Sequence, residues 1–172
     1  VSSMNRMAKV LRSTNASVPI AEVLDVGGFD LDRAVATKPT FLTPEYPFEW
    51  AAELQLEPGE YELVMQEGPD QSMAIATIAL SDTEVATSKA ALERAVRIWG
   101  QGAQSWKPSA CIPIVDQQPH TLILEGKGAK HFRLLSTTTQ RVGLYTQHLP
   151  SEFQLQLWHA GVAVSFIAQQ EF

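Results

Sequence analysis

The chain contains very little cysteine, with Cys111 alone among 172 residues. A single thiol excludes an intramolecular disulfide framework and a zinc site built only from cysteines. Cys111 stands in the apolar segment 110–114. Free cysteines in such segments are among the most buried side chains. We therefore expect Cys111 to be a buried and inert thiol rather than a reactive one.

Long hydrophobic runs and clusters of basic residues are absent as well. No apolar run approaches the roughly 18 residues of a membrane span, and the first residues lack the apolar centre of a secretory signal. The net charge of -6 argues against the basic surface of a nucleic-acid-binding protein. We expect a cytoplasmic protein with neither a membrane nor a nucleic acid as its partner.

The chain does contain enough apolar residues for a folded domain, with 45% hydrophobic and 19% charged residues. Its first part nevertheless looks incomplete. Residues 9–13 predict one strand and residues 19–26 one short helix, and Gly27 and Gly28 can end that helix. One strand and one helix cannot enclose a core. We interpret 1–37 as the remnant of a larger α/β domain, which suggests that the chain is a piece of a longer protein.

Two further expectations concern this first part. The prolines Pro39, Pro44 and Pro47 make 38–47 an extended linker, because proline fixes φ and removes a backbone donor. An unpaired strand near Val10 would leave an open edge that favours pairing with another chain. We therefore expect either self-association through residues 1–40 or disorder of that segment.

From Phe48 onwards the hydrophobic pattern has a period of two. From Phe48 to Leu56, every second residue is apolar, and the residues between them form an acidic face that includes Glu49, Glu53 and Glu57. This alternation predicts a half-buried strand. A turn at 58–59 and a second alternating segment at 60–66 predict a hairpin with that strand. We expect the carboxylates of this hairpin to be solvated rather than paired for acid/base catalysis, and 73–80 to form a third, buried strand.

One helix and six further strands complete the prediction. Ser81 and Glu84 have the spacing of a capping box, which predicts a helix over about 82–99. Its apolar residues Val85, Leu92, Val96 and Trp99 should lie near one face. Short alternating segments then follow at 110–115, 120–125, 130–136, 141–147, 153–159 and 162–168. The pattern predicts a mainly β fold, an antiparallel β-sandwich or jelly-roll-like domain over 48–172 with one α-helix.

A stretch before this domain resembles a known family. Residues 8–13, 18–20 and 23–34 resemble the end of the GTPase domain of CobW-like metallochaperones. The last segment contains Gly27-Gly28-Phe29-Asp30-Leu31-Asp32-Arg33 and ends at Ala34. Gly28 stands where the family usually has alanine. The chain has no phosphate-binding Gly-x-x-x-x-Gly-Lys-Ser/Thr loop, no guanine-reading segment and no Cys-x-Cys-Cys motif. We expect no nucleotide binding and no enzymatic activity from this chain alone.

The β-rich part carries a second resemblance. Residues 47–51, 67–73 and 145–153 are similar to an accessory domain that follows the GTPase domain in some bacterial CobW-like proteins. The usual C-terminal domain of the family does not follow in this sequence. The resemblance implies a role in zinc handling, with a GTPase domain or a client metalloprotein as the partner.

The strongest candidate site is His148 with Glu152, because imidazole and carboxylate both suit Zn²⁺. Further ligands could come from Glu67, Asp70 or Glu49, with Glu53 and Met73 as weaker choices. The alternative is structural: His148 bonds the loop backbone and Glu152 caps a turn. The other histidines, His120, His131 and His159, form no chelating pair, and we expect them at the surface.

Three functions remain open from the sequence. The first is a non-catalytic accessory metal-binding module, with zinc as the metal. The second is a metal-free docking module for another protein. The third is a jelly roll that binds carbohydrate or another small ligand, which a large open pocket lined by an exposed tryptophan would favour. We expect the four tryptophans mainly to pack in the core.

Overall fold

The computed structural model describes residue 36 and the ranges 45–114 and 118–172. Contacts divide the chain between Pro44 and Glu45, and the fold below is that of Glu45–Phe172. The strand predicted at 9–13, the helix at 19–26 and the family motif at 23–34 lie outside the described residues. So does most of the predicted linker, and self-association through the first 40 residues therefore stays a prediction.

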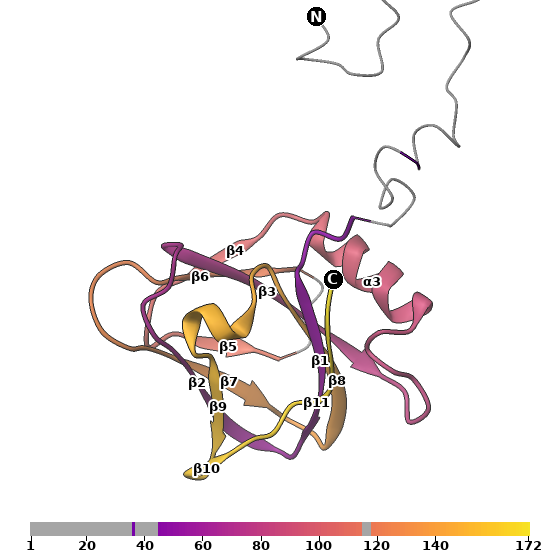
Figure 1. Ribbon diagram of the computed structural model, residues 1–172. Helices are drawn as coiled ribbons and strands as arrows, with labels where there is room; N and C mark the ends of the chain where they lie inside the picture. The colour runs from indigo at the N-terminus through magenta and orange to yellow at the C-terminus, as the bar shows by residue number, and fades with distance from the viewer. Residues whose placement is uncertain (1–35, 37–44, 115–117) are drawn as a thin grey trace, which may run out of the picture. The chain divides into compact units, whose positions relative to one another are not determined.

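Two β-sheets pack face to face, with one helix against the outer face of the larger sheet (Figure 1). The strands are β1 (Trp50–Leu56), β2 (Gly59–Met65), β3 (Ser72–Leu80), β4 (Gln104–Trp106), β5 (Cys111–Pro113), β6 (His120–Ile123), β7 (Lys130–Ser136), β8 (Gln140–Thr146), β9 (Gln156–His159), β10 (Val162–Ala163) and β11 (Ile167–Glu171). The helices are α3 (Lys89–Trp99) and the short 3-10 helix η1 (Pro150–Phe153). The predicted mainly β sandwich with one helix is confirmed.

The larger sheet has the strand order β11-β1-β8-β3-β6-β4, and the smaller has β10-β9-β2-β7-β5. Most neighbours are antiparallel, but β4 pairs with β6 and β5 with β7 in parallel, so both sheets are mixed. The sequence indicated neither parallel pair, and it did not predict β4. No helix in the described part of the chain is long and apolar enough to cross a membrane.

The period of two places alternate side chains of each strand in the core between the sheets. Trp50, Leu54, Leu63, Met73 and Phe132 all belong to this core and are nearly inaccessible to solvent. A second cluster lies between the larger sheet and α3. β1 is therefore covered on both faces, and burial of apolar area on each face stabilises it at about 25 cal/mol per Å².

The predicted hairpin of the first two strands is wrong. β1 pairs with β8, with Trp50 opposite Thr146, whereas β2 pairs with β7 and β9 in the other sheet. The connection at 57–59 crosses between the sheets. There the Tyr61 hydroxyl accepts from the backbone N–H of Glu57 at 2.7 Å and donates to its carbonyl at 3.1 Å. Alternation marks the faces of a strand but does not choose its partner.

The helix begins later than predicted. α3 starts at Lys89, and the Ser88 side chain accepts from the Ala91 N–H at 3.3 Å as its N-cap. Ser81 and Glu84 do bond to each other, but in a turn that precedes the helix. The face of α3 that packs on the sheet consists of Ala91, Leu92 and Ala95. The prediction that Val85 and Val96 share the packed face is wrong, because both are exposed.

Two single-residue predictions are also wrong. Cys111 is exposed, because the buried residue of β5 is its neighbour Ile112 and successive side chains of a strand point to opposite faces. His120 is buried, and its Nδ1 accepts a hydrogen bond from the Trp106 indole at 3.0 Å. His131 is exposed as predicted, whereas His159 is partly covered and stacks on the Tyr61 ring.

Candidate metal centre

Three of the predicted ligands come together at one end of the sandwich. Glu49, His148 and Glu152 each offer one ligand atom, and these atoms all lie within 4.8 Å of one another. The three residues come from different parts of the fold: the residue before β1, the segment after β8, and η1. This is the one group of three or more such side chains among the described residues.

Pairing of β1 with β8 places Glu49 beside His148. The Glu49 N–H donates to the Thr146 carbonyl at 3.0 Å, which extends the β1–β8 ladder by one residue. The Phe172 N–H donates to the Glu49 carbonyl at 2.9 Å. On the other side, the Thr146 hydroxyl donates to the His148 carbonyl at 2.7 Å and fixes the chain as it leaves β8. The backbone of two ligands is therefore held by one end of the larger sheet.

The third ligand is held by η1. Pro150 stands at the start of this turn, where its fixed φ is favourable. The Glu152 N–H donates to the Leu149 carbonyl at 3.1 Å, and the next residue, Phe153, is fully buried. The Phe153 carbonyl accepts from the Gln66 N–H at 2.7 Å. Burial of Phe153 anchors the turn and leaves the Glu152 carboxylate exposed beside His148.

His148 has two neighbours in addition to the two glutamates. Its ring lies 6.0 Å from the Phe153 ring, measured between centroids. Its Nε2 lies 3.4 Å from Oδ2 of Asp70, which is in the loop between β2 and β3. Asp70 is not a member of the three-residue cluster. A carboxylate on one imidazole nitrogen commonly orients the ring of a metal-ligating histidine, and Asp70 could do so if Nδ1 of His148 is the ligand atom.

The remaining predicted or considered ligands lie elsewhere. The Glu67 carboxylate accepts from the Gly128 N–H at 2.6 Å and so holds the turn before β7. The Met73 side chain is buried between the sheets. Glu53 is buried and paired with Arg141 at 2.6 Å. The prediction that Glu53 lies on a solvated acidic face is therefore wrong, whereas Glu49 and Glu57 are exposed.

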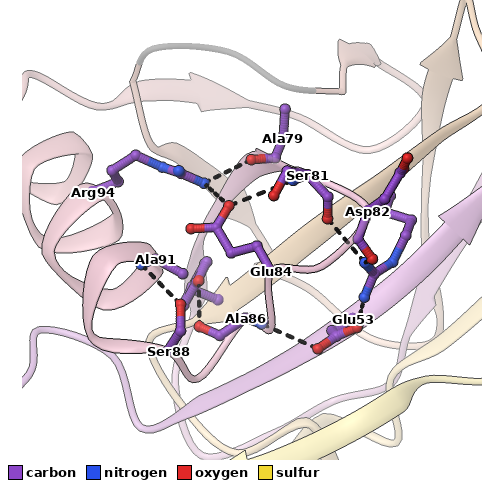
Figure 2. Close-up of polar contacts among 11 residues, drawn as sticks. Glu53, Ala79, Ser81, Asp82, Glu84, Ala86, Ser88, Ala91 and Arg94 are labelled. Atoms are coloured by element: carbon purple, nitrogen blue, oxygen red, sulfur yellow. Dashed lines mark hydrogen bonds and ion pairs between the residues drawn. The ribbon is translucent and has the colours of Figure 1, made fainter.

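Glu53 belongs to a network that the sequence did not indicate (Figure 2). Its carboxylate also accepts from the Ala86 N–H at 3.1 Å, and Arg141 donates to the carbonyls of Ser81 and Asp82. Arg94 of α3 bonds Glu84 at 3.0 Å and the Ala79 carbonyl at 2.7 Å. Arg141 thus joins the loop 81–88 to the larger sheet, and Arg94 joins it to α3. Both arginines and both glutamates of this network are paired, which indicates a structural role.

The chemistry of the cluster is that of an open nitrogen and oxygen site. One imidazole and two carboxylates suit zinc and similar divalent ions. Zinc bonds of 2.0–2.2 Å in a tetrahedral arrangement would separate ligand atoms by about 3.3 Å. The observed spread of up to 4.8 Å therefore requires a small closing movement. The side chains of Glu49 and Glu152 are exposed and free of packing that would prevent it.

We compared the chain with protein-family models, with curated proteins and with solved structures. None of the three comparisons gives a match.

Proposed function

We propose that Glu45–Phe172 is a non-catalytic module that binds a divalent metal ion reversibly, with zinc as the preferred ion. The observation that carries the proposal is the convergence of Glu49, His148 and Glu152 within 4.8 Å from three separate parts of the fold. His148 and Glu152 are only four residues apart in sequence, but Glu49 is brought to them only by strand pairing. The three side chains supply ligand types that zinc accepts.

The site suits transfer of a metal better than permanent storage. Three protein ligands leave at least one coordination position for water or for a ligand from another protein. Exposed carboxylates can also release the ion at less cost than a closed cysteine site. The resemblance of residues 8–34 to the end of a CobW-like GTPase domain supports this context. On this proposal the partners are that GTPase domain and a client metalloprotein.

A docking module is the second candidate, and one feature favours it. Every residue of β11 is exposed, and Ile167 and Phe172 present large apolar side chains at this edge of the larger sheet. No strand of the described residues pairs with the outer edge of β11. Open edges of this kind can add a strand from a partner protein. In this account His148 and Glu152 only shape the loop.

Metal affinity separates the two candidates. The experiment is a calorimetric titration of the metal-stripped chain with Zn²⁺, beside Glu49→Gln, His148→Ala and Glu152→Gln. We expect one site with a dissociation constant of about 1 μM or below, weakened at least about tenfold in each variant. Affinity should fall on acidification, because the ligands must be unprotonated to bind the ion.

A matched control is available on the smaller sheet. His131 and Glu62 form an exposed contact of 2.8 Å between Nδ1 and Oε1, with no third ligand beside them among the described residues. His131→Ala and Glu62→Gln should leave Zn²⁺ affinity unchanged. Equal binding by all variants would place the metal elsewhere on the chain. No binding by the unaltered chain would refute the metal proposal and leave the docking module.

A further inference from the structure

A polar groove lies on the outer face of the smaller sheet, and none of its lining residues belongs to the metal cluster. Its volume is about 340 Å³, within the range of small-ligand sites. Strands β2, β7 and β9 supply most of its lining, and the turn between β9 and β10 supplies the rest. The lining residues are Glu60, Tyr61, Glu62, Arg133, Trp158, Ala160 and Gly161.

Strand register explains why three of these residues meet. Glu62 of β2 is directly opposite Trp158 of β9 and also directly opposite Arg133 of β7. Residues opposite each other on neighbouring strands point to the same face. Their neighbours Leu157 and Phe132 are buried between the sheets, so this face is the outer one. An aromatic ring, an acceptor and a donor therefore form one row across the sheet.

The strand that carries Glu60 and Glu62 is anchored from its inner face, because the Tyr61 side chain points into the core between the sheets. Tyr61 is buried, and its hydroxyl is bonded to the backbone of Glu57. His159 stacks on Tyr61 with 4.2 Å between ring centroids, and its Nδ1 contacts the Glu60 carbonyl at 3.0 Å. A preformed site loses little conformational entropy on binding. These inner-face contacts fix the backbone from which Glu60 and Glu62 project into the groove.

Each charged side chain of the groove contacts a polar side chain of the same sheet. Arg133 contacts Glu60 at 3.3 Å, and Glu62 contacts His131 at 2.8 Å at the rim. A surface with paired donors and acceptors gives little preference to an anion or a cation. It can instead bond hydroxyl groups, which donate and accept. Trp158 adds an apolar ring that remains partly exposed, and tryptophan combines an apolar body with a polar edge.

From this combination we propose that the groove binds a neutral saccharide. The apolar face of a sugar ring would lie against Trp158, and its hydroxyls would donate to Glu62 and accept from Arg133. The site is open to solvent along the sheet face, so it suits part of an oligosaccharide better than an enclosed small molecule. This proposal does not depend on the metal cluster, which is built by other residues.

The test is a titration of the full chain with neutral oligosaccharides of glucose, N-acetylglucosamine, galactose, mannose and xylose. Binding is read from the NMR signals of the isotopically labelled chain, including the Trp158 indole N–H. We expect at least one series to bind, with affinity reduced at least about tenfold by Trp158→Ala and by Arg133→Gln. Leu135→Ala is the control, because Leu135 is exposed on the same face of β7 but outside the groove.

Folding and specificity are checked in the same series. Arg133 is half exposed, so Arg133→Gln should keep the native spectrum even if Trp158→Ala does not. Absence of binding by all five sugar series would overturn the proposal, as would binding that both groove variants leave unchanged. A preference for charged ligands, such as free amino acids, would overturn it too. His148→Ala and removal of metal should not affect saccharide binding, so this proposal and the metal proposal can fail separately.

Discussion

Glu53 and Arg141 form an ion pair of 2.6 Å between Oε2 and Nη2, in the layer between the larger sheet and the segment that leads into α3. The Glu53 side chain is 6% exposed and that of Arg141 is 27% exposed. Glu53 also accepts from the Ala86 N–H, so its carboxylate links two strands with the loop 81–88 (Figure 2). One buried carboxylate therefore attaches this loop to the sheet.

Glu53→Gln should lower the free energy of unfolding by about 2–3 kcal/mol, because it leaves the Arg141 charge without its counter-ion. The expected loss is smaller than for a fully buried pair, since Arg141 keeps contact with solvent. Urea denaturation measures the change. Glu62→Gln, which alters an exposed carboxylate, should change stability by no more than about 0.5 kcal/mol. Equal effects of the two variants would contradict a structural role for the pair.

The start of α3 can be tested by comparing two serines. Ser88→Ala should destabilise the fold by about 1 kcal/mol, because the Ala91 N–H loses the side chain that caps the helix. Ser81→Ala should cost less, because the Ser81 contacts with Glu84 and Arg141 involve its backbone groups. Thermal or urea denaturation distinguishes them. A larger loss for Ser81→Ala would indicate that the helix begins at the earlier capping box.

Tyr145 connects β8 to the same loop. It is fully buried, and its hydroxyl donates to the Ala86 carbonyl at 2.7 Å. Tyr145→Phe should cost about 1–2 kcal/mol of stability, since it leaves a buried carbonyl without its donor. The control is Tyr46→Phe, because the Tyr46 ring lies at the margin of the same cluster. The difference in unfolding free energy between the two variants isolates the effect of the hydrogen bond from Tyr145 to Ala86. A neutral result at Tyr145 would show that water replaces the lost donor.

Burial raises the pKa of the Tyr145 hydroxyl well above its ordinary value of 10.0; Arg94 opposes the shift, and Glu84 and Glu53 add to it. The folded chain therefore keeps this proton at a pH where the unfolded chain releases it. The stability from this group is complete below pH 10 and decreases as the pH rises further. Unfolding free energies measured from about pH 8 to about pH 11 should show this decline, and Tyr145→Phe should reduce its slope.

Gly68 packs against Phe153, which lies beside the metal ligand His148, so a substitution at Gly68 tests the support of the cluster. A Cβ at this position would collide with the Phe153 ring, which is buried and lies beside His148. Gly68→Ala should destabilise the fold by about 1–3 kcal/mol through overpacking and should also weaken Zn²⁺ binding. Gly102→Ala is the control, because nothing lies within 4 Å of an added Cβ there. Denaturation and calorimetry together measure both effects. Unchanged zinc affinity in Gly68→Ala would show that Phe153 does not position the ligands.

Local pattern was sufficient for some of the individual strands, but it missed β4, and the single strand predicted at 162–168 is wrong, because β10 and β11 are separate strands in different sheets. The segment predicted at 130–136 is β7 with the same limits, and 141–147 differs from β8 by one residue at each end. Strict alternation of His131 and Arg133 with buried residues explains this success. The strand predicted at 153–159 was placed less accurately, because Pro150 to Phe153 form a 3-10 helix and β9 begins only at Gln156.

The candidate site was only partly visible in the sequence. His148 and Glu152 are four residues apart, so a local loop can bring them together. Glu49 and Glu67 were equally reasonable additions, and the structure separates them: pairing of β1 with β8 brings Glu49 in, whereas Glu67 bonds Gly128. The sequence did not indicate where a ligand groove would lie, because the groove at Trp158 is formed by three strands from distant parts of the chain.

The sequence by itself determined that this is a mainly β domain, where most strands lie, and which face of β7 meets solvent. Only the tertiary structure decided the partner of each strand, the burial of Glu53 and His120, and the exposure of Cys111. The physical reason is that alternation is a local property of the backbone. Which face is covered, and by what, depends on apolar surfaces contributed by residues far away in the chain.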